Sequence, residues 1–99
     1  MGVNVSELLA KVPTGLLING EWRDAASGET FEVENPATGE TLATLASAGS
    51  DDAMAALDAA CAVKDEWART SRRERSNILR RAFELVTERK DEFAALMTL

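Results

Sequence analysis

The stretch that most constrains the fold runs from Ser71 to Leu99 and has the longest uninterrupted helical pattern in the chain. Ser71 followed by Glu74 has capping-box spacing, so we expect a helix to begin there. No Gly, Asn or Pro follows Met97 to stop it. An apolar face this long needs a partner, which favours a piece of a larger protein. The apolar residues recur three and four positions apart and share one face: Ile78, Leu79, Ala82, Leu85, Val86, Phe93, Leu96 and Met97.

Residues 1–15 form a lead-in segment. Val5, Leu8, Leu9 and Val12 have helical spacing, with Ser6 as a candidate cap. A proline at position 13 then stops any helix. The pattern fits one or two helical turns docked on the body of the protein or a loose tail.

Two β-hairpins are predicted between residues 16 and 46. Asn19-Gly20 between apolar residues favours a type I′ turn, because both central positions need a positive φ. We expect Trp22 to pack across the face next to this turn. Residues 30–34 alternate in polarity as a half-buried strand does, residues 35–39 form a turn, and residues 40–46 return.

A second helix is expected over residues 50–70. Ser50 can cap it, and Asp51 and Asp52 lie in its first turn, where the helix dipole favours anions. Small residues along one side, Cys61 among them, would let another element approach closely, with Trp67 covering the seam. Almost no loop separates this helix from the one over 71–99, so we expect an angled or antiparallel pair.

The charge balance bears on partners. The net charge is −6; residues 1–50 carry 2 basic and 7 acidic side chains, and residues 51–99 carry 9 and 10. This acidic balance argues against sequence-independent nucleic-acid binding. Five arginines do cluster between Arg72 and Arg81. We interpret them as a solvated helix face paired with Glu84 and Glu74, with a phosphate or partner site as the alternative.

The single cysteine, Cys61, permits no internal disulfide, which fits a reducing compartment. No apolar run reaches the roughly 18 residues needed to span a bilayer. The first residues also lack the basic start and apolar core of a signal peptide. We therefore expect a cytoplasmic protein with no membrane partner. With only 5% aromatic residues, the chain is thinly supplied for a core of its own.

Catalytic constellations are missing from these 99 residues. The absence of histidine excludes a His-based triad or a His-containing zinc site within them. No phosphate-binding glycine motif is present. Cys61 lies among alanines with Lys64 three positions on, and we interpret it as a buried small hydrophobe rather than a nucleophile. We interpret Asp51 and Asp52 as capping residues rather than a cation site, and both tryptophans as packing residues. The sequence therefore predicts no catalytic, cofactor-binding or metal-binding residue.

Several motifs in order resemble the aldehyde dehydrogenase superfamily. Residues 18–22 (INGEW) resemble its opening hairpin, and residues 31–40, with NPATGE at 35–40, resemble its second. Ala59-Ala60 with Trp67 is similar to its first helix, and residues 75–81 (RSNILRR) and 96–99 (LMTL) to its second. The resemblance covers residues 16–99, and the ALMTL ending looks most like the bacterial succinate-semialdehyde dehydrogenase branch.

The resemblance implies an α/β parent of several hundred residues with a Rossmann-type cofactor domain, of which residues 16–99 are an incomplete N-terminal part. The family oxidises aldehydes to carboxylic acids with NAD or NADP, through a cysteine thiolate, a glutamate base and an asparagine donor that lie downstream. None of these maps onto a residue here, and Cys61 is not in the context of the catalytic cysteine. The backbone around Val33 and Glu34 corresponds to a structural cation site in some members, which we do not assign to this chain.

The resemblance thus predicts a segment of an NAD(P)-dependent enzyme, itself inactive and without bound cofactor. Its partners would be the remainder of the parent chain and, for the parent, a small aldehyde and other copies in a homo-oligomer. Two alternatives stay open. The chain could be a non-catalytic helical module that self-associates through its apolar helix face. It could also be a complete small α+β domain.

Overall fold

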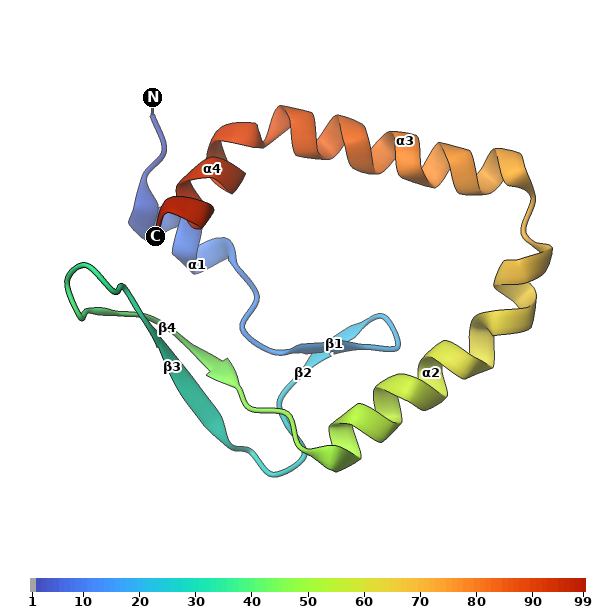
Figure 1. Cartoon of the computed structure of the whole chain (residues 1–99), viewed down its shortest axis with the longest axis horizontal. Helices are drawn as coiled ribbons and strands as arrows, with labels where there is room; N and C mark the ends of the chain where they lie inside the picture. The colour runs from blue at the N-terminus through green and yellow to red at the C-terminus, as the bar shows by residue number, and fades with distance from the viewer. Residues whose placement is uncertain (1) are drawn as a thin grey trace.

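A computed structural model describes residues 2–99 of the chain, so Met1 of the predicted lead-in lies outside the described residues. Figure 1 shows a short helix, two hairpins and three helices around an open frame. The predicted order of two hairpins followed by helices is confirmed. The elements are α1 (Val5–Lys11), β1 (Leu16–Ile18), β2 (Glu21–Arg23), β3 (Thr30–Glu34), β4 (Thr41–Ala46), α2 (Ser50–Arg69), α3 (Arg72–Glu88) and α4 (Lys90–Thr98).

The first hairpin has the predicted turn. Asn19 and Gly20 have φ values of 53° and 77°, the two positive angles that a type I′ turn requires. Trp22 lies opposite Leu17 across the antiparallel pair β1–β2. Both side chains are nevertheless more than half exposed, at 56% and 57%. The expected packing of Trp22 is therefore limited to its cross-strand neighbour, although Leu17 also lines a hollow with Ala59 and Ala60 of the following long helix.

The second hairpin, β3–β4, also matches its prediction. The Oδ1 of Asn35 accepts a hydrogen bond from the Ala37 N–H at 2.9 Å, and the Gly39 N–H donates to the Asn35 carbonyl at 2.7 Å. Gly39 has a φ of 75°, as expected for the residue that closes this turn. The ladder shifts register between Val33 and Glu34. The predicted half-burial of β3 is mostly wrong, since only Val33 among its residues is partly buried.

A buried carboxylate joins the hairpin region to the first long helix. Asp52, in the first turn of α2, is 4% exposed. Its oxygens accept hydrogen bonds from the N–H of Gly49 at 3.0 Å and from the N–H of Ala26 at 3.1 and 3.3 Å. Gly49, not Ser50, is the N-cap, so the predicted Ser50 cap is wrong. The Asp52 carboxylate, at the third position of the helix, instead accepts from the N–H of the N-cap residue itself and also reaches the loop before β3.

These contacts hold the pKa of the Asp52 carboxyl below its ordinary value. The hydrogen bond from the Gly49 N–H is the largest cause, burial acts in the opposite direction, and the Ala26 N–H and the Arg23 charge add to the lowering. Backbone N–H donors favour the ionised form because they stabilise its negative charge.

The predicted helix over 71–99 is interrupted. Ser71 caps α3, its Oγ accepting from the Glu74 N–H at 3.1 Å as expected. The helix ends at Glu88, and α4 begins at Lys90 after Arg89 leaves helical geometry at φ −104° and ψ 19°. Thr87 Oγ1 donates to the Phe83 carbonyl at 2.8 Å just before the break, a contact that bends helices. Hydrophobic periodicity cannot reveal this break, because its spacing continues across it.

The bend brings α4 to the lead-in helix. Figure 1 shows α1 beside α4, and the hollows between them are lined by residues of both helices. Leu8 of α1 is 5% exposed and lines a groove with Phe93 and Leu96 of α4. The lead-in is therefore a docked helix rather than a loose tail. Its cap is Asn4, whose Oδ1 accepts from the Glu7 N–H, and not Ser6 as predicted.

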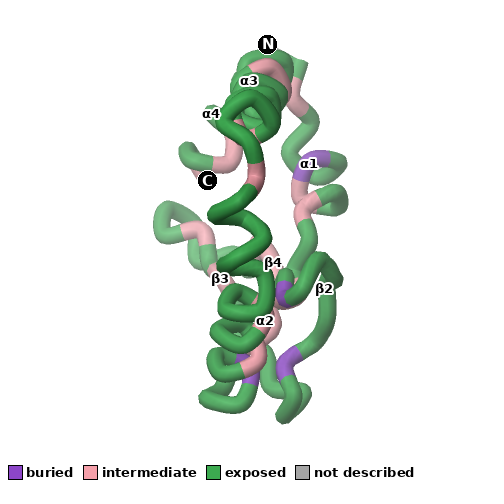
Figure 2. Tube along the Cα trace, turned by 90° about the vertical axis from the view of Figure 1, so that its right-hand side faces the viewer, coloured by how far each residue is buried: buried purple, intermediate pink, exposed green. Residues whose placement is uncertain are grey.

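Helices α2 and α3 form an angled pair, and the antiparallel alternative is wrong: Figure 1 shows them meeting at a corner. Both are exposed along most of their length (Figure 2). The chain's radius of gyration is 17.0 Å, against about 13 Å for a globular domain of this length. Among residues 2–99, the buried apolar residues are Leu8, Ile18 and Ala25. The apolar faces of the long helices are thus left without a partner inside this chain.

None of the helices in residues 2–99 combines the length and the apolar character that crossing a membrane requires.

The first turn can be tested through Gly20. We expect Gly20→Ala to destabilise the β1–β2 hairpin by about 1 kcal/mol, because a Cβ is strained at this positive φ. The measurement is the intensity of cross-strand NOEs between Leu17 and Trp22. Gly2→Ala, at a position with no neighbour within 4 Å of the added Cβ, is the matched control. Equal NOE intensities in the two variants would contradict the prediction.

The Asp52 junction should make the start of α2 sensitive to acid. Because the folded-state pKa is lowered, this carboxylate stabilises the fold above its unfolded pKa. That contribution is lost as the pH falls through the lower, folded-state pKa. We expect the Ala26 and Gly49 amide protons to lose protection from exchange over this range, and Asp52→Asn to weaken the protection already at pH 7. Asp51→Asn, next to it and exposed, is the control; equal loss in both variants would refute the specific role of Asp52.

Candidate functional site

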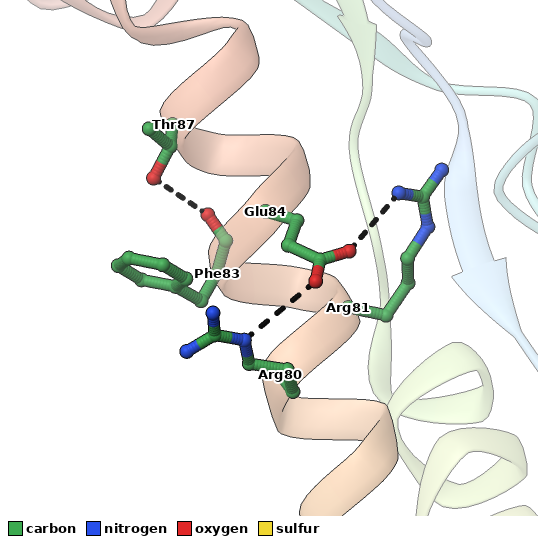
Figure 3. A network of polar contacts seen from close by, with 5 residues as sticks. All are labelled: Arg80, Arg81, Phe83, Glu84 and Thr87. Atoms are coloured by element: carbon green, nitrogen blue, oxygen red, sulfur yellow. Dashed lines mark hydrogen bonds and ion pairs between the residues drawn. The ribbon is translucent and has the colours of Figure 1, made fainter.

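The arginine-rich face of α3 is the most polar surface feature of the helices. Figure 3 shows Glu84 between two arginines: it lies 3.6 Å from Arg80 Nε and 3.4 Å from Arg81 Nη1. The Arg80 guanidinium also lies over the Phe83 ring, 5.1 Å from its centroid. The predicted pairing with Glu84 is confirmed. No ion pair of Glu74 is found within residues 2–99, where its backbone N–H serves the Ser71 cap instead.

These contacts support the helix and take no part in proton transfer. The arginine side chains of the two ion pairs are 71% and 61% exposed, and exposed pairs one helical turn apart contribute only about 0.3–0.5 kcal/mol. An arginine also remains protonated at any working pH and cannot act as a base. This part of α3 can bind an anionic or aromatic partner but supplies no proton transfer.

Cys61 is exposed on α2, so the expectation of a buried residue is wrong. The small side chains of Ala59 and Ala60 line a hollow with Ile18 of β1, whereas Cys61 itself is exposed. These 99 residues contain no histidine to activate the thiol. The geometry therefore offers no nucleophile–base pair at this position.

Asp51 and Asp52 have different roles. Asp52 is buried and accepts the backbone N–H groups of Gly49 and Ala26, which confirms its interpretation as a capping residue. Asp51 is exposed. Within residues 2–99 no group of three or more His, Cys, Asp or Glu side chains is placed to hold a metal ion. The backbone at Val33 and Glu34 lies where the β3–β4 ladder shifts register.

Among the open grooves along the helices, two combine apolar and charged lining residues. One, between α1 and α4, is lined mostly by the apolar residues that dock these helices. The other lies at the corner of α2 and α3, where Trp67 is 47% exposed and covers no seam, contrary to expectation. Its lining includes Arg75, whose Nε is shielded from solvent and has no hydrogen-bond partner within residues 2–99. The sequence could not reveal this unpaired donor, because its shielding depends on how α2 and α3 meet.

Comparisons with known proteins agree with the order of hairpins and helices. Residues 22–99 match the aldehyde dehydrogenase family. The chain is 46% identical over 83 residues to the NADP(+) succinate-semialdehyde dehydrogenase GabD of Escherichia coli K12, covering 84% of this chain and 17% of that protein. It is 67% identical over 58 residues to a succinate-semialdehyde dehydrogenase of Paenarthrobacter nicotinovorans, covering 59% of this chain and 13% of that protein.

A solved structure shares the fold. The crystal structure of an E. coli NADP-dependent enzyme superposes with a TM-score of 0.87 at 42% identity, over 95% of this chain and 19% of that one. The chain thus spans less than a fifth of the length of each of these three proteins. The matches cover both hairpins and the long helices, and their sequence identities are well above the level at which two proteins share only a fold. The chain therefore belongs to the aldehyde dehydrogenase family.

Proposed function

We propose that this chain is the N-terminal segment of an NAD(P)-dependent aldehyde dehydrogenase that oxidises succinate semialdehyde to succinate. The proposal rests on the ordered motifs INGEW, NPATGE and LMTL, together with 67% identity over 58 residues to a succinate-semialdehyde dehydrogenase. On this proposal residues 16–99 are part of the cofactor-binding domain, residues 1–15 are its lead-in, and the whole protein works as a cytoplasmic homo-oligomer.

The oxidation itself would use groups outside these residues. The aldehyde hydrogen leaves as a hydride to the nicotinamide, and water supplies the second carboxylate oxygen. Both steps need a positioned nucleophile and a base. The one thiol here, Cys61, is exposed and has no histidine in these 99 residues to activate it, and the buried carboxylate of Asp52 accepts from two backbone N–H groups. The role of this segment is therefore structural.

The test is an assay of the complete natural gene product. We expect it to reduce NAD⁺ or NADP⁺ when succinate semialdehyde is added, whereas the 99-residue chain produces no reduced cofactor above a buffer blank. Glutarate semialdehyde, one methylene longer, serves as the comparison substrate for specificity. Turnover by the 99-residue chain would refute its structural role. A gene product inactive on every aldehyde would refute the assignment.

A second function, self-association of a 99-residue module, is favoured by the exposure of the helix faces. Leu79, Phe83 and Met97 are 72%, 58% and 81% exposed, and apolar surface of this kind promotes association. If this function holds, the sedimentation coefficient of the 99-residue chain rises with concentration. A single monomeric species over a hundredfold range would count against it.

A further inference from the structure

The tip of the first hairpin contains an asparagine followed directly by a glycine. Asn19 and Gly20 are both exposed, and a Cβ added to Gly20 would meet no atom within 4 Å. Gly20 lies between Ile18 and Glu21, which pair across the turn, so its backbone N–H stands outside the strand ladder. The side-chain amide of Asn19 and the backbone nitrogen that follows it are thus neighbours on the surface, with no side chain between them.

The other three asparagines of the chain lack this combination. Asn4 and Asn35 each accept a backbone hydrogen bond through Oδ1, at 3.1 and 2.9 Å. The β-branched Val5 follows the first, and Pro36, which has no backbone N–H, follows the second. Asn77 lies inside α3, where helical hydrogen bonds hold the backbone. These three positions are therefore internal controls for the chemistry of Asn19.

The turn geometry decides whether the two groups can react. The first central residue has a ψ of about +30° in a type I′ turn and of about −120° in a type II′ turn. Only the second value brings the Gly20 nitrogen to the same side as the Asn19 Cβ, as closure of a five-membered ring requires. Rotation of the one peptide plane between these residues interconverts the two turns, and both fit a two-residue hairpin. The reactive form is a minor one, because type II′ turns favour glycine at that position, but it does not require β1 and β2 to separate.

We propose that Asn19 is a site of spontaneous deamidation, a modification that needs no reactant other than water. The Gly20 nitrogen loses its proton to solvent base and attacks Asn19 Cγ, which is unhindered because glycine has no Cβ. The Cγ–Nδ2 bond breaks, ammonia leaves with a proton from water, and a succinimide ring remains. Water then opens the ring at Cγ to give aspartate, or at the Asn19 backbone carbonyl to give isoaspartate. The sum replaces the side-chain NH₂ by OH without oxidation or reduction.

The two products affect the hairpin differently. Aspartate–glycine also favours a type I′ turn, so the aspartate form keeps the strand register. In isoaspartate the chain runs through the side chain, and the extra methylene lengthens a turn whose length sets the pairing of Ile18 with Glu21. Ile18 is 8% exposed and lines a hollow with Ala59 and Ala60 of α2. The isoaspartate form therefore loosens the first hairpin and its contact with α2.

Mass spectrometry of the complete gene product tests the site. After incubation in mildly alkaline buffer, we expect the tryptic peptide of residues 12–23 to gain the mass difference between an amide and a carboxylic acid. The peptides that contain Asn4, Asn35 and Asn77 should keep their masses. A synthetic peptide of residues 12–23 should react faster than the protein, because no hairpin limits the conformation of Asn19. A protein that stays unchanged at Asn19, or that reacts equally at the other asparagines, would overturn the proposal.

Hydrogen exchange separates the two products. Asn19→Asp has the charge of both products but an ordinary backbone, so we expect residues 16–23 to keep the protection of the unmodified protein. The aged protein, enriched for isoaspartate by ion exchange, should lose most of that protection. Equal protection in the variant and the aged protein would refute the lengthening of the turn.

Discussion

The Asp52 carboxylate is the contact on which the arrangement of hairpins and helices depends. It accepts hydrogen bonds from the N–H of Gly49, the N-cap of α2, and from the N–H of Ala26, in the loop between the hairpins. One side chain thus fixes both the start of a 20-residue helix and the loop that lies 26 residues earlier. The Arg23 charge lowers the pKa of Asp52 further and so favours the ionised acceptor, which forms the stronger hydrogen bonds.

Beyond this junction, little apolar surface is buried. Within residues 2–99 the buried apolar side chains are those of Leu8, Ile18 and Ala25. The helices are held locally instead, by the Ser71 cap, the Thr87 contact and the ion pairs of Glu84. Local contacts of this kind set the course of each helix but contribute little free energy each. The burial that would stabilise the long helices has to come from surface they do not meet within this chain.

The contrast between well-formed helices and little buried apolar surface bears on the function of this segment. A segment with well-defined helices and exposed apolar faces is suited to being covered by further protein. Membership in the aldehyde dehydrogenase family accounts for such a segment, because the chain spans only 17% of its E. coli relative.

The sequence by itself determined the elements that depend on local chemistry. Asn19-Gly20 and Asn35 to Gly39 predicted two turns because positive φ and Asx hydrogen bonds are properties of those residues. Ser71 with Glu74 predicted the start of α3 for the same reason. The ordered motifs predicted the family, which the comparisons confirm.

Only the tertiary structure decided the features that join distant residues. The Asp52 bond to Ala26, the break at Arg89 that brings α4 to α1, and the shielding of Arg75 Nε depend on how the elements meet in space. The exposure of Cys61 and Trp67 has the same origin, since an apolar pattern predicts which face needs a partner but not whether this chain provides one.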